Sequence, residues 1–300
     1  MDVSDVQRKG AKPGSSFGMR MGLLFGTNIA VIGLFTIVAA VLGVDPQGIV
    51  GLTIFAALFG FGGAFISLAL SKKIAKRSTG AHVIERPANE TESWLVDTIA
   101  RQSKEAGIEM PEVAIYPSDD VNAFATGMKR NDALVAVSVG LLQNMNKDEV
   151  EGVLAHEISH VANGDMVTLT LIQGVVNTFV ILISRIVANV IVNAVTRGRG
   201  GRGIYFMVVI ALQVVLGFFA SMIVMWFSRR REFKADAGAA ALEGAPKMIA
   251  ALESLQRQRP GTPLPDEVAA FGIRPSVGNG VFRKLLTTHP PIQDRIAALR

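Results

Sequence analysis

The sequence predicts a polytopic helical membrane protein that is mainly α-helical, with about four transmembrane helices and a separate domain containing a small β-sheet. Half of the 300 residues are hydrophobic and only 18% are charged, whereas soluble domains carry about 25% charged residues. The apolar residues are also gathered into long runs, which polar stretches separate. These observations exclude a disordered chain and a protein that simply binds nucleic acid.

Four apolar runs are long enough to cross a membrane. Met21–Val44, Ile49–Leu70 and Ile204–Phe227 contain no charged residue, and Val167–Val195 contains only Arg185. A bilayer core of about 30 Å takes about 20 helical residues. An arginine at the bilayer centre costs about 2.5–3.5 kcal/mol. We therefore expect four spans with the third deformed, and a last pair that never fully crosses remains the alternative.

Basic residues set the expected orientation. The connection 45–48 between the first two runs has no basic residue. The outer ends of these runs are flanked by basic residues: Arg8, Lys9, Lys12, Arg20, Lys72, Lys73, Lys76 and Arg77. The positive-inside rule then places both flanks in the cytoplasm. The loop between the last two runs is also basic, contrary to this rule for an outside loop. We attribute the net charge of +5 to topology, and expect a lipid bilayer and no nucleic acid as partner.

The expected organisation has five parts. Residues 1–20 form a cytoplasmic N-terminal segment, 21–70 a first membrane hairpin, 71–166 the first part of a soluble domain, 167–227 a second hairpin and 228–300 the second part. The first run is too long for a signal-peptide core and is typical of a retained anchor. Cysteine is absent, so no disulfide framework exists.

Local patterns predict the elements of the soluble parts. Helices are expected over 90–106, 147–163, 229–243 and 246–257, strands over 113–116, 122–126 and 133–139, and a loop over 260–280. Asn146 with Glu149 three residues later resembles a capping box. Asn163-Gly164 is a helix stop signal.

One motif on the predicted 147–163 helix indicates chemistry. His156-Glu157-Ile158-Ser159-His160 places two imidazoles four residues apart, on one helical face, where they can share a metal ion. Glu157 lies beside the first ligand and can act as the general base of a zinc hydrolase. The alternative is a helix whose two histidines are solvent-facing or satisfied in the core.

A catalytic zinc site needs a third protein ligand and leaves a position for water. Glu232 is the strongest downstream candidate, and Asp236 lies one helical turn later. Asp236 could accept a hydrogen bond from a ligand histidine and fix its tautomer. The alternative is that Glu232 is a solvated acid among arginines.

These residues together resemble a known family. The motif His156–His160, its extension 163–166 and the segment 228–240 are similar to the HtpX-type heat-shock membrane metalloproteases, which are gluzincins. Further likeness lies at 90–106, 121–127 and Thr288-His289-Pro290-Pro291, so it covers most of the chain. Phe233 stands where the family more often has Tyr, and the extension before residue 20 and the loop 260–280 are less typical.

The resemblance implies a zincin-like α+β catalytic domain on the cytoplasmic side of a bacterial-type inner membrane. It implies one Zn²⁺ per chain, bound by His156, His160 and Glu232, with Glu157 catalytic. It also implies endopeptidase activity in quality control and stress response, with misfolded or damaged membrane proteins as substrates. The family leaves the oligomeric state open.

Two further roles are expected for a protease of this kind. His289 is a candidate donor to the developing oxyanion, with a structural loop histidine as the alternative. The stretch Asn122, Ala123, Phe124 and Ala125 is a candidate edge strand for pairing an extended substrate, with an ordinary sheet strand as the alternative.

Other functions remain open from the sequence. An exopeptidase would need a group dedicated to the substrate amine, and no such motif stands out. A membrane transporter or a client-binding scaffold with a structural metal site is the alternative from another class. Four apolar runs and Arg185 favour the transporter, whereas the intact Glu157 argues against an inactive scaffold.

Overall fold

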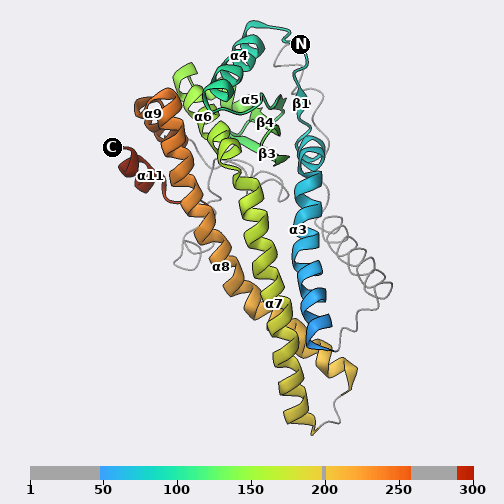
Figure 1. Ribbon diagram of the computed structural model, residues 1–300. Coiled ribbons are helices and arrows are strands. Elements are labelled where there is room, and N and C mark those ends of the chain that lie inside the picture. Colours follow the sequence, from blue (N-terminus) through green and yellow to red (C-terminus); the bar gives the residue numbers. More distant parts are fainter. Residues whose placement is uncertain (1–47, 198–200, 258–288) are drawn as a thin grey trace. The chain divides into compact units, whose positions relative to one another are not determined.

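The computed structural model describes residues 48–197, 201–257 and 289–300 (Figure 1). Its helices are α3 Ile49–Thr79, α4 Glu90–Glu105, α5 Val139–Asn144, α6 Lys147–Asn163, α7 Asp165–Thr196, α8 Arg202–Glu243, α9 Ala245–Arg257 and α11 Ile292–Leu299. Its strands are β1 His82–Val83, β2 Glu112–Tyr116, β3 Ala123–Lys129 and β4 Asp132–Ser138. The predicted first span Met21–Val44 and the predicted loop 260–280 lie outside the described residues.

The chain divides into two compact units. One unit contains the described residues from Leu68 to Leu169 and those from Met225 onward, and the other contains residues 48–67 and 170–224. Helices α3, α7 and α8 each contribute to both units. The sheet and the motif helix α6 belong wholly to the first.

The second unit consists of apolar helices long enough to cross a membrane. Candidate spans are Val50–Thr79, Asp165–Thr196 and Arg202–Glu243, each with only 17% of its most apolar window buried in the protein. Helix α3 packs tightly on α7, because a Cβ on Gly60 would lie 2.2 Å from the hydroxyl oxygen of Thr178. The exposed large hydrophobic side chains therefore lie mostly where lipid can cover them.

Helix α7 is continuous over its 32 residues, so the deformation expected around Arg185 does not occur. The Arg185 guanidinium carbon lies 4.3 Å from the ring centroid of Phe55, in a cation–π contact. The arginine is thus accommodated by an aromatic neighbour from α3 and not by a break in the helix.

The first unit is built on a four-stranded mixed sheet with the order β1-β2-β4-β3. Strand β4 is parallel to β2 and antiparallel to β3, and β1 is antiparallel to β2. Ala125 of β3 pairs with Val135 of β4. Strand β3 is the last strand of the sheet over the described residues, as the sequence predicted for an edge position.

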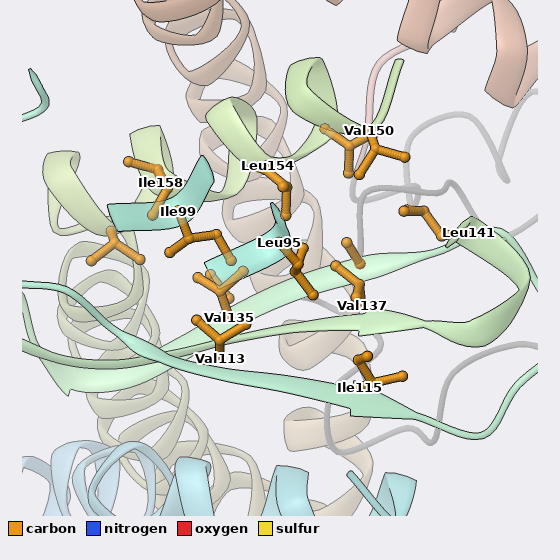
Figure 2. Packing of buried hydrophobic residues seen from close by; sticks show 14 of the residues in the cluster. Leu95, Ile99, Val113, Ile115, Val135, Val137, Leu141, Val150, Leu154 and Ile158 are labelled. Carbon is orange, nitrogen blue, oxygen red and sulfur yellow. The ribbon is translucent and has the colours of Figure 1, made fainter. Parts of the chain in front are cut away.

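Helices α4 and α6 cover one face of this sheet and close the main core (Figure 2). Strand side chains of that face meet the apolar faces of the two helices: Val113, Ile115, Val135 and Val137 with Leu95, Ile99, Val150, Leu154 and Ile158. A buried aliphatic side chain contributes about 1.5–3 kcal/mol by leaving water. This core fixes α6, the helix that carries the motif, against the sheet.

Local signals define the two ends of α6. The Asn146 side chain accepts from the Glu149 N–H, and the Glu149 carboxylate accepts from the Asn146 N–H, which completes a capping box. Gly164 ends the helix with φ 68°, a left-handed conformation that glycine adopts without a Cβ penalty. Asp165 then begins α7 directly.

Helix α8 joins the last apolar run to the acidic pair of the sequence prediction. Its 42 residues form one helix of about 63 Å, so the separate helix expected over 229–243 is the end of the membrane helix. Gly238 lets α8 approach α6 closely, because a Cβ there would lie 2.6 Å from Ser159 Oγ. This contact sets the distance between the motif helix and Glu232.

Candidate metal centre

Helix α6 presents two buried imidazoles on one face. His156 is 0% and His160 is 9% exposed. Their Nε2 atoms lie 3.1 Å apart, and the rings meet edge to face. Two nitrogen lone pairs so close together need a shared partner, which a metal ion or a proton supplies.

Glu232 of α8 adds a third donor to the pair. Its carboxylate oxygens lie 3.5 Å from His156 Nε2 and 3.4 Å from His160 Nε2. A tetrahedral zinc ion with bonds of about 2.0–2.1 Å separates its ligand atoms by about 3.3 Å. His156, His160 and Glu232 each place a ligand atom within 4.8 Å of the other two, close enough to share one metal ion.

Each histidine meets a carboxylate through its other ring nitrogen. Nδ1 of His156 lies 2.9 Å from Asp236 Oδ1, and Nδ1 of His160 lies 2.6 Å from Asp165 Oδ2. A proton donated from Nδ1 to each carboxylate leaves the Nε2 lone pair free for a metal. The sequence prediction named Asp236 for this position and assigned no role to Asp165.

Arg295 of α11 is a residue that sequence reasoning missed. It is 0% exposed, and it donates from Nε to Asp236 Oδ2 at 2.8 Å and from Nη2 to Asp236 Oδ1 at 2.6 Å. This bidentate pair holds the carboxylate that faces His156. A lone arginine near the C-terminus offers no spacing signal, so only the fold could bring it to the site.

The charges of this centre fit a divalent cation. Four carboxylates meet here: Glu157, Asp165, Glu232 and Asp236. Among the described residues, Arg295 supplies a guanidinium to Glu232 and Asp236, whereas Arg231 donates to the backbone carbonyl of Asp165, so the carboxylates outnumber the guanidinium groups paired with them. The same carboxylates act on His160. Burial lowers the pKa of its imidazole, but hydrogen bonds with Asp165 and Glu232 raise this pKa to about 10.

Glu157 has the position and the environment of a general base. Its side chain is buried, and neither carboxylate oxygen has a hydrogen bond of ordinary geometry among the described residues, while the backbone of Ala125 favours the charged form of the carboxyl. Burial raises the pKa of this carboxyl, while His156 and His160 oppose the shift. An unpartnered buried carboxylate is costly, and a substrate water would satisfy it.

A small pocket connects these groups to the sequence-predicted accessory residues. It is lined by Ala125, Glu157, His160, Met166, Arg231, Glu232 and His289. Nδ1 of His289 lies 2.7 Å from Glu232 Oε2, so the imidazole reaches the third ligand. Of the predicted strand residues, Ala125 reaches the pocket, whereas Asn122 and Ala123 precede it along the chain and Phe124 packs on the other face against Tyr116.

Such a centre, on a chain with apolar helices of membrane-spanning length, defines a membrane metallopeptidase. Comparisons with known proteins agree. The model of peptidase family M48 matches residues 89–300. A protein named Protease HtpX homolog from Desulfotalea psychrophila is 58% identical over 284 residues, which cover 93% of this chain and 98% of the relative. The chain belongs to peptidase family M48.

Two further relatives fit this assignment. A Protease HtpX from Xanthomonas euvesicatoria pv. vesicatoria is 58% identical over 283 residues, 94% of this chain and 97% of the relative. The crystal structure of Ste24p from S. mikatae has the same fold, with a TM-score of 0.64 at 17% identity over 94% of this chain. This chain spans 64% of that protein. Nothing in these findings favours the transporter alternative.

Proposed function

We propose that this protein is a zinc-dependent endopeptidase of the bacterial cytoplasmic membrane, with its catalytic domain facing the cytoplasm. The three-donor cluster of His156, His160 and Glu232 carries the proposal, because its ligand atoms lie close enough to share one metal ion and are two imidazoles and a carboxylate, a donor set that catalytic zinc sites use. The sequence parts 71–166 and 228–300 together supply the catalytic domain. The apolar parts of α3, α7 and α8 supply the described membrane helices.

The side chains then have distinct tasks in peptide hydrolysis. Bound zinc would supply Lewis-acid polarisation of the scissile carbonyl and lower the pKa of a water. Glu157 takes the proton from the attacking water and delivers it to the leaving amine. Asp165 and Asp236 keep both histidines in the tautomer whose Nε2 faces the metal.

Two accessory roles follow from the pocket. His289 is the proposed donor to the developing oxyanion; because its Nδ1 faces the accepting carboxylate of Glu232, a donation from Nε2 as well requires the doubly protonated ring. Strand β3 receives the extended substrate by main-chain pairing. Ala125, whose small side chain lines the pocket, marks where that strand passes the metal.

Zinc analysis tests the ligand set. Glu232→Ala is expected to lower the zinc content of the detergent-purified protein far below that of the parent. Glu253→Ala is the matched control, because Glu253 is a half-buried acid on α9 that pairs with Arg300, away from the three donors. Equal zinc content in both variants would remove Glu232 from the ligand set.

The long helices support two crossings by α7 and α8. Along α7, Arg185 lies about 30 Å beyond Asp165, which is about the thickness of a bilayer core. Helix α7 continues past Arg185 to Thr196, and Phe55 contacts the guanidinium of this arginine. Because the chain lacks cysteine, Arg202→Cys carries a single thiol, and we expect impermeant reagents to label it from outside. Labelling only from the cytoplasm would contradict two crossings.

Misfolded or damaged membrane proteins are the proposed substrates. A catalytic unit continuous with membrane helices is placed to meet cytoplasmic segments of proteins in the same bilayer. In proteoliposomes, we expect faster cleavage of a destabilised membrane protein than of its folded form. A client-binding scaffold would capture the destabilised protein without cutting it.

A further inference from the structure

Arg231 is a pocket residue to which the catalytic steps above assign no task. It precedes Glu232 on α8 and lines the same pocket as Glu157 and His160. Its Nη1 donates to the backbone carbonyl of Asp165 at 3.1 Å, and its Nη2 donates to Ser228 Oγ at 3.1 Å. The guanidinium is therefore held in one orientation.

The Nε donor of this side chain has no acceptor among the described residues. Nε of Arg231 is buried and makes no hydrogen bond within the described part of the chain. A buried donor without a partner costs about 1–3 kcal/mol, and more when it is charged. A fixed and desolvated donor in a substrate pocket is arranged for an oxygen that arrives with the substrate.

The geometry of strand pairing supplies such an oxygen. A peptide that pairs with β3 turns successive carbonyls to opposite sides, so β3 can satisfy only those on one side. The metal would polarise the carbonyl of the scissile bond. The other peptide carbonyls that point away from β3 still need hydrogen-bond donors. Ala125 lines the pocket from β3, and Arg231 lines it from α8.

We propose that Arg231 is a substrate-binding residue, whose guanidinium donates to a backbone carbonyl of the peptide next to the scissile bond. This inference rests on the proposed function. Because the contact is to backbone, it confers affinity for extended peptides of any sequence. It acts on substrate binding and not on the reacting carbonyl, so its loss affects KM more than kcat.

The test uses the full-length enzyme in detergent and a fluorogenic peptide that spans a bond it cleaves in unfolded β-casein. Arg231→Gln is expected to raise KM by about 10- to 100-fold, the range for a hydrogen bond from a charged donor. We expect kcat and zinc content close to those of the parent. In the Glu157→Gln background, the Kd of the peptide rises by the same factor.

Arg230→Gln is the matched control, because Arg230 is the adjacent arginine and lies over Trp226, 4.3 Å from its ring centroid. The same charge is removed at the same end of the membrane helix, and KM is expected to stay unchanged. A series of peptides with one thioamide each locates the contact, since sulfur accepts hydrogen bonds weakly. The thioamide next to the scissile bond should weaken binding to the parent and not to Arg231→Gln.

Three results would overturn the inference. The first is loss of zinc in Arg231→Gln in proportion to lost activity, which would mean that Arg231 acts only through Asp165 and His160. The second is a KM of Arg231→Gln equal to that of Arg230→Gln. The third is a loss of binding from the thioamide that is as large in Arg231→Gln as in the parent, because independent effects add. Failure of the proposed function would give a different result: the parent and Glu157→Gln would cleave equally. Peptide binding to Arg231→Gln would then still decide the role of Arg231.

Discussion

The carboxylate of Asp165 lies 2.6 Å from Nδ1 of His160, across the junction between the motif helix and a membrane helix. Asp165 is the first residue of α7, and Gly164 is the only residue between the two helices. The metal centre therefore begins where a candidate membrane span begins. Orientation of one zinc ligand depends on how α7 starts.

Removal of this carboxylate is expected to weaken metal binding. Asp165→Asn should lower zinc affinity by about 10- to 100-fold, the usual effect of losing the carboxylate behind a ligand histidine. Competition with a chelator of known affinity measures it. Asp97→Asn serves as control, because Asp97 is exposed on α4. Unchanged affinity in Asp165→Asn would show that His160 is oriented without it.

The buried pair of Arg295 and Asp236 predicts a large effect on stability. Arg295→Met leaves Asp236 buried without its bidentate partner, and we expect a loss of about 3–5 kcal/mol of unfolding free energy. Denaturant unfolding of the detergent-purified protein measures it. Arg300→Met, at an exposed position, should cost little. Equal stability of the two variants would contradict this role.

Close packing between α6 and α8 predicts a steric effect at Gly238. Gly238→Ala places a methyl group 2.6 Å from Ser159 Oγ, so α8 must shift from the motif helix. We expect a loss of about 1–3 kcal/mol, together with weaker zinc binding. Gly217→Ala is the control on the same helix, because its Cβ meets nothing within 4 Å. Normal zinc binding in Gly238→Ala would mean that the helices adapt freely.

Metal removal is expected to destabilise the catalytic domain, because its buried carboxylates then lack a compensating dication. Free zinc at about one hundred times its Kd stabilises a folded site by about 2.7 kcal/mol. A chelator should therefore lower Tm, and added zinc should restore it. The Tm of Glu232→Ala should respond to neither treatment. An identical Tm with and without zinc in the parent would argue against a site formed in the folded state.

The sequence predicted the local elements well because their signals are short in range. The capping box of Asn146 and Glu149, the stop at Gly164 and the motif spacing all involve neighbours along one helix. Glu232 could be predicted because few candidates for a third metal ligand lie downstream of the motif. Arg295 was not, because its contact with His156 joins residues 139 positions apart and only α11 brings it inward.

Continuity between elements was harder to predict than their existence. The sequence predicted the apolar run 204–227 and a helix over 229–243 as two elements, whereas α8 runs unbroken through both. Arg185 suggested a deformed span, whereas Phe55 receives it within a regular helix. For Arg185, a contact partner distant in sequence receives the charge.

The role of Glu157 is tested most directly by zinc content and proteolysis measured together on the parent and on Glu157→Gln. We predict that the variant retains the parent's zinc and no longer cleaves unfolded β-casein, because the glutamine keeps the shape of the side chain but cannot accept the proton of the water. Turnover equal to that of the parent would contradict the assignment of Glu157 as the general base.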